Sequence, residues 1–81
     1  MTHKERLYKA LKSELEAKVN EALLTLDLCF NKPTAIGEHT SEHFVKEASK
    51  ALDKLTEARD KIDVLNTYME GYTGDKKLLN D

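Results

Sequence analysis

Two stretches of about thirty residues without glycine or proline set the strongest limit on how this chain can fold. They cover residues 3–30 and 41–70 and consist almost entirely of good helix formers. The helix breakers Pro33 and Gly37 lie between the two stretches, and Gly71 follows the second. The sequence therefore predicts two long helices over about residues 3–30 and 41–70.

Residues that cap helices stand at the expected ends of both stretches. Thr2 followed by Glu5 is a capping box at the start of the first helix. Thr40 or Ser41 can cap the second helix through a side-chain oxygen. Gly71 is expected as the first residue beyond that helix, where a left-handed backbone is common.

Apolar residues recur along both stretches in steps of three and four, which is typical of helices packed lengthwise. In the second stretch they are Phe44, Ala48, Ala51, Leu55, Ala58, Ile62, Leu65, Met69 and Tyr72. In the first they are Tyr8, Leu11, Leu15, Val19, Ala22, Leu26 and Cys29. A connection of about ten residues lets the second helix fold back along the first, so the sequence predicts an all-α, antiparallel two-helix hairpin. The expected neighbours are Ala22 and Ala48, Leu15 and Leu55, and Tyr8 and Ile62.

A chain of 81 residues is long enough for one domain. We expect the hairpin to occupy residues 1–72, with an ordered turn at 31–40. The remaining residues, 73–81, are short and mixed in character, and are expected to form a flexible tail.

The expected seam between the helices leaves several large apolar side chains without cover. They are Leu23, Leu24 and Leu28 in the first helix and Val45, Leu52, Val64 and Tyr68 in the second. Small chains that lack disulfides and metals commonly gain stability by forming oligomers. The sequence therefore predicts a homodimer that completes a four-helix bundle, and Leu23, Leu24 and Leu28 are candidate partner-binding residues.

The charge and cysteine content argue against several other classes. Fifteen acidic and thirteen basic residues give a net charge of −2, which does not favour a nucleic-acid or membrane binder. Basic residues of the first helix interleave with acidic ones, so a solvated face is expected, and nucleic-acid association remains the alternative function. These basic residues are Lys4, Arg6, Lys9, Lys12 and Lys18. Cys29 is the sole cysteine, and Asp27 interrupts the longest apolar run, so a cytoplasmic protein without a membrane segment is expected.

No sequence motif indicates an enzyme, and we expect no catalytic residue, cofactor or metal. His39 and His43 are four residues apart, which suits a zinc site only on a continuous helix. The second helix is expected to begin at Thr40 or Ser41, which leaves His39 outside it. Cys29 could act as a nucleophile beside a histidine, but a lone cysteine on an apolar helix face is more often a small buried residue.

The connecting segment is distinctive, because it contains an isoleucine, Ile36, between two special backbone positions. Pro33 fixes one backbone angle, and Gly37 permits a positive φ. The segment reads Asn31-Lys32-Pro33-Thr34-Ala35-Ile36-Gly37-Glu38-His39. It resembles the turn of short uncharacterised helical-hairpin proteins encoded by large tailed bacteriophages, and the resemblance covers most of residues 20–66. Those proteins usually have proline after the histidine, where this chain has Thr40. The resemblance implies a phage accessory protein of the host cytoplasm or the virion, and it carries no site residues with it.

The turn is also a candidate binding surface. Ile36 can close the core between the helix ends, and Glu38 and His39 would then face outward. Whether the turn binds a partner or only caps the fold stays open at this point. We expect a non-enzymatic protein–protein interaction module, either a virion part or a modulator of a host protein, that uses an apolar face or this turn.

Overall fold

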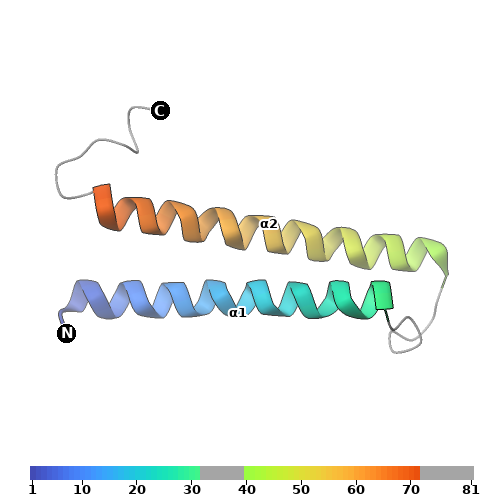
Figure 1. The fold of residues 1–81 in the computed structure, drawn as a ribbon, viewed down its shortest axis with the longest axis horizontal. Coiled ribbons are helices and arrows are strands. Elements are labelled where there is room, and N and C mark those ends of the chain that lie inside the picture. The colour runs from blue at the N-terminus through green and yellow to red at the C-terminus, as the bar shows by residue number, and fades with distance from the viewer. Residues whose placement is uncertain (32–39, 72–81) are drawn as a thin grey trace.

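A computed structural model of the protein describes residues 1–31 and 40–71. They form two α-helices, α1 (His3–Asn31) and α2 (Ser41–Gly71). The helices lie side by side and antiparallel along their whole length (Figure 1). The predicted all-α hairpin is confirmed. Each helix ends one residue later than expected, and Gly71 is the last helical residue of α2 instead of the first residue beyond it.

Side-chain caps begin both helices. The backbone N–H of Glu5 donates to Thr2 Oγ1 at 3.1 Å, and Glu5 Oε1 accepts from the backbone N–H of Thr2 at 2.9 Å. The predicted capping box is therefore present. At the start of α2, the backbone N–H of His43 donates to Thr40 Oγ1 at 3.0 Å. Thr40 is thus the N-cap, and Ser41 is the first helical residue.

The most deeply buried side chains between the two helices are small. Ala22, Ala51 and Ala58 are 1%, 4% and 2% exposed, whereas larger seam residues such as Leu15 and Leu55 are only half-buried. Among the described residues, no side chain larger than a methyl group is fully buried. A pair of helices covers only one side of each large side chain, so the hairpin has a narrow core.

Two polar contacts across the seam define the register of the helices. The Tyr8 hydroxyl donates to Asn66 Oδ1 at 2.7 Å, and Lys54 Nζ donates to Glu21 Oε1 at 2.8 Å. Ile62 was the expected neighbour of Tyr8. The observed partner, Asn66, lies four residues further along α2. The apolar pattern repeats every three or four residues, so a shift of one helical turn leaves it equally well matched.

We predict that overfilling the alanine contact destabilises the hairpin. Ala22→Leu forces the helices apart and should lower the free energy of unfolding by about 1–3 kcal/mol. Ala17→Leu makes the same change at an exposed position of α1 and should alter stability by less than about 0.5 kcal/mol. Urea unfolding followed by circular dichroism measures both. Equal losses would show that Ala22 is not at the closest approach.

We also predict that Thr40 contributes to stability through its cap. Thr40→Ala removes the oxygen that accepts the His43 N–H and should cost about 1 kcal/mol. Ser41→Ala is the matched control, and its effect in the same urea titration should be close to zero. A larger loss for Ser41→Ala would reassign the cap to that residue.

Candidate protein-binding surface

Rows of residues seven apart flank the seam on each helix, and the middle of one side of the hairpin is charged. This charged flank consists of Glu14 and Glu21 from α1 and Lys54 and Lys61 from α2. Its centre is the Glu21–Lys54 ion pair at 2.8 Å. The hydrogen bond and positive charge of Lys54 lower the pKa of the Glu21 carboxyl from its ordinary value. On this side of the hairpin, an acidic residue of α1 is therefore paired with a basic residue of α2.

The other side carries an apolar flank, which consists of Leu23 and Phe30 from α1 and Val45 and Leu52 from α2. Phe30 and Val45 line the same hollow, so they lie on one face of the hairpin. Leu23 is seven residues before Phe30 and Leu52 is seven after Val45, so both continue that face. The four side chains are 42%, 74%, 69% and 52% exposed in the order Leu23, Phe30, Val45 and Leu52. Large apolar groups are thus gathered in water at the turn end of the molecule.

The hollow between Phe30 and Val45 is small and apolar. It has a volume of about 200 Å³ and is lined by Cys29, Phe30, Phe44, Val45 and Ala48. Since Phe44 and Ala48 belong to the seam, the hollow opens directly beside the core. An apolar side chain from another polypeptide could fill it and cover both the flank and the seam.

Further from the turn, the same face becomes charged. Glu16 lies seven residues before Leu23, and Arg59 lies seven after Leu52. Glu16 and Arg59 line a common hollow, which places them on one face. The face is therefore apolar near the turn and carries one acidic and one basic residue, on different helices, in its next layer.

The structure does not bring together the three leucines that were expected to bind a partner. Leu23 belongs to the apolar flank. Leu24 is two residues beyond buried Ala22, about 200° around α1, and so faces away from α2. Leu28 lies seven residues after Glu21, on the charged side. Phe30, Val45 and Leu52, which were not predicted as partner-binding residues, share the surface with Leu23; their seven-residue spacing was the available signal.

The expected turn site lies outside the described residues. This applies to Ile36, Glu38 and His39, and to the ordered turn itself. The pairing of His39 with His43 is outside for the same reason. Within residues 1–31 and 40–71, no cluster of three or more histidine, cysteine or acidic side chains could hold a metal ion.

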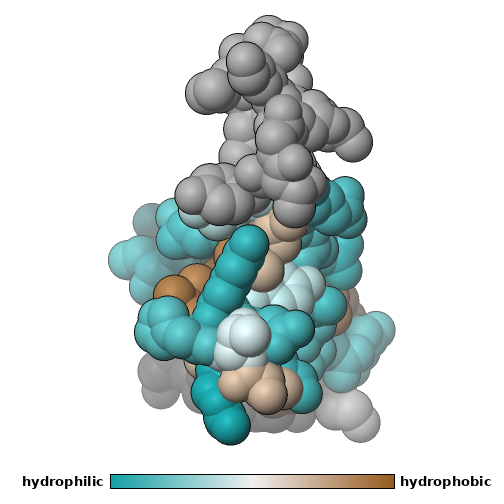
Figure 2. Space-filling view, turned by 90° about the vertical axis from the view of Figure 1, so that its left-hand side faces the viewer, coloured by the Kyte–Doolittle hydropathy of each residue, from teal (hydrophilic) through white to brown (hydrophobic). Residues whose placement is uncertain are grey.

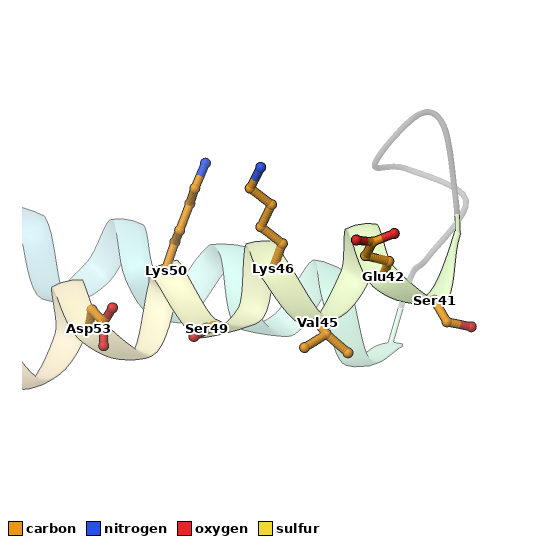
Figure 3. A pocket seen from close by; sticks show the side chains of 7 residues that line it. All are labelled: Ser41, Glu42, Val45, Lys46, Ser49, Lys50 and Asp53. Carbon is orange, nitrogen blue, oxygen red and sulfur yellow. The ribbon is translucent and has the colours of Figure 1, made fainter.

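Another hollow is an open groove on the outside of α2. Its volume is about 830 Å³, and the described residues that line it are Ser41, Glu42, Val45, Lys46, Ser49, Lys50 and Asp53. Figure 3 shows Lys46 and Lys50 pointing to one side of the helix and Val45 and Asp53 to the other. The lining side chains do not converge, so this groove is a weaker binding surface than the apolar flank.

The basic residues of α1 do not form one surface. Lys12 Nζ lies over the Tyr8 ring, 5.7 Å from its centroid, at the edge of the seam. Arg6 is two residues before Tyr8 and therefore lies on the far side of the helix. Viewed from the end where α1 begins and α2 ends, the visible surface is mostly hydrophilic, with small apolar areas between polar groups (Figure 2). No stripe of positive charge favours this helix as a phosphate-binding element.

Comparison of the chain with known protein families, curated proteins and solved structures found no match. Neither described helix has the length and apolarity needed to span a membrane.

We predict that the Glu21–Lys54 pair stabilises the hairpin in a pH-dependent way. The folded pKa of Glu21 is lowered, so its contribution is present above the ordinary carboxyl pKa and is lost as pH falls through the lowered value. Glu21→Gln should therefore be less stable than the native chain at pH 7, and this difference should vanish in strong acid. Thermal melts from pH 7 to pH 2 measure it. In a Lys54→Met background the difference should be much smaller, because only the weaker effect of the Lys18 charge remains, and an undiminished difference would contradict the pairing.

Proposed function

We propose that this protein is a non-enzymatic interaction module whose apolar flank docks another polypeptide. The observation that carries the proposal is the joint exposure of Leu23, Phe30, Val45 and Leu52 on one face. Clustered exposed apolar side chains commonly mark protein–protein contacts, because their burial removes water from apolar surface.

The contrast between the two flanks supports this choice of surface. The charged flank has an internal ion pair, and its side chains are well solvated. The apolar flank includes Phe30 and Val45, which are more exposed than any seam residue that the structure describes. A partner that covers them also covers the half-buried edge of Phe44, which increases the apolar area removed from water.

The resemblance of the connecting segment to phage hairpin proteins supports a role as a phage accessory protein. Such a module would act by binding, either within a virion or on a host protein. The Asn31–His39 segment that carries the resemblance is mostly outside the described residues, so the turn remains a second candidate contact.

Site-specific photocrosslinking tests the proposed function. Replacing Phe30 by p-benzoylphenylalanine keeps an aromatic group in place, and irradiation of expressing cells should give a covalent adduct of higher mass. Asp53, in the groove outside α2, is the matched control position and should give none. The adduct should survive nuclease treatment and be destroyed by protease.

Equal labelling from both positions, or no adduct from position 30, would contradict docking at the apolar flank. An adduct that nuclease removes would support the nucleic-acid alternative instead. Salt dependence gives an independent check, because phosphate contacts weaken steeply as salt rises and apolar contacts do not.

A further inference from the structure

We propose that the polypeptide docked on the apolar flank is a second copy of this chain, with the two hairpins parallel and both turns at the same end. This inference rests on the proposed function, since it names the partner of the same surface. The two copies would be related by a twofold axis that runs parallel to the helices, and each α1 would lie against α2 of the other copy.

The first argument is the match of apolar residues across such an axis. The Tyr8–Asn66 and Glu21–Lys54 contacts show which residues of α1 and α2 lie at the same height. By that register Leu23 stands level with Leu52, and Phe30 stands level with Val45. A twofold axis parallel to the helices preserves height, so Leu23 of one copy meets Leu52 of the other, and Phe30 meets Val45. Each of these contacts occurs twice.

The second argument is charge complementarity in the next layer. Glu16 and Arg59 line one hollow at the same height of the hairpin, on α1 and α2 respectively. In the parallel arrangement Glu16 of each copy faces Arg59 of the other. Two opposite-charge contacts therefore lie next to the apolar flank, in the layer further from the turn, and they favour this orientation. Every helix is also antiparallel to both of its neighbours, as in common four-helix bundles.

The reverse orientation fits this surface poorly. If complete hairpins overlapped with their turns at opposite ends, the apolar layers of Leu23 and Phe30 would lie on the charged half of the other copy. That arrangement would desolvate charges against apolar groups. An overlap restricted to the turn ends would avoid this, but it would leave Glu16 and Arg59 outside the contact, which makes the two arrangements experimentally distinct.

Analytical ultracentrifugation tests the second copy as occupant. The native chain should sediment as a dimer at micromolar concentration. Leu52→Ser should weaken the dimer by roughly a hundredfold, since each copy loses an exposed leucine that the dimer would cover. Leu24→Ser removes an equally apolar and exposed side chain from the outer face of α1. This control should change the dissociation constant by less than about twofold.

Mixing of charge-reversal variants tests the orientation. Glu16→Arg and Arg59→Glu each place like charges in contact in their own dimers, and each should weaken self-association by roughly tenfold or more. A mixture of the two variants restores opposite charges at both contacts and should form a heterodimer near native affinity. Rescue between chains distinguishes this effect from a loss of charge pairing within one hairpin, because each mixed chain keeps its own defect.

Several results would overturn the inference. A native chain that stays at 9.2 kDa at high micromolar concentration excludes the second copy. A photocrosslink from position 30 to a different protein would then leave the proposed function intact, whereas the absence of any crosslink would remove both. A dimer that tolerates both charge reversals, or that mixing fails to restore, excludes the parallel arrangement.

Discussion

The burial of Ala22, Ala51 and Ala58 between α1 and α2 is the contact on which the rest of the structure depends. Small side chains let the two backbones come near, and this brings the longer side chains of the seam into reach of each other. The Tyr8–Asn66 and Glu21–Lys54 bonds join the two helices in one register. Two helices cover only part of each larger side chain, so every large seam residue within residues 1–31 and 40–71 keeps part of its surface in water.

The residues that flank this thin core differ between the two sides of the hairpin. On one side, charged residues line the middle of the seam, and the Glu21–Lys54 pair spans it. On the other side, the flanking residues nearest the turn are apolar, and no other described side chain buries them. An interface on that side would add the missing layer to the core while leaving the charged side in solvent. The apolar contacts made on binding would then also stabilise the folded hairpin.

The candidate site could be predicted from the sequence only in part. The sequence identified large apolar residues that the seam would leave uncovered, and these included Leu23, Val45 and Leu52. Leu23, Leu24 and Leu28 were expected together as the uncovered residues of the first helix, but they point in different directions around α1. Phe30 joins Val45 only through the antiparallel pairing of two distant segments, and it took their common hollow to show that they share a face.

The sequence by itself determined the helices, their caps and the hairpin. Those features follow from local preferences: two long runs of helix formers, breakers between them, Thr2 with Glu5, and Thr40 before α2. Only the tertiary structure decided the register and the chemical difference between the flanks. An apolar stripe with a period of three to four residues matches its partner equally well after a slip of one turn. The alanine contacts and the two polar bonds between distant residues select one alignment, and that alignment places each flanking row opposite its counterpart.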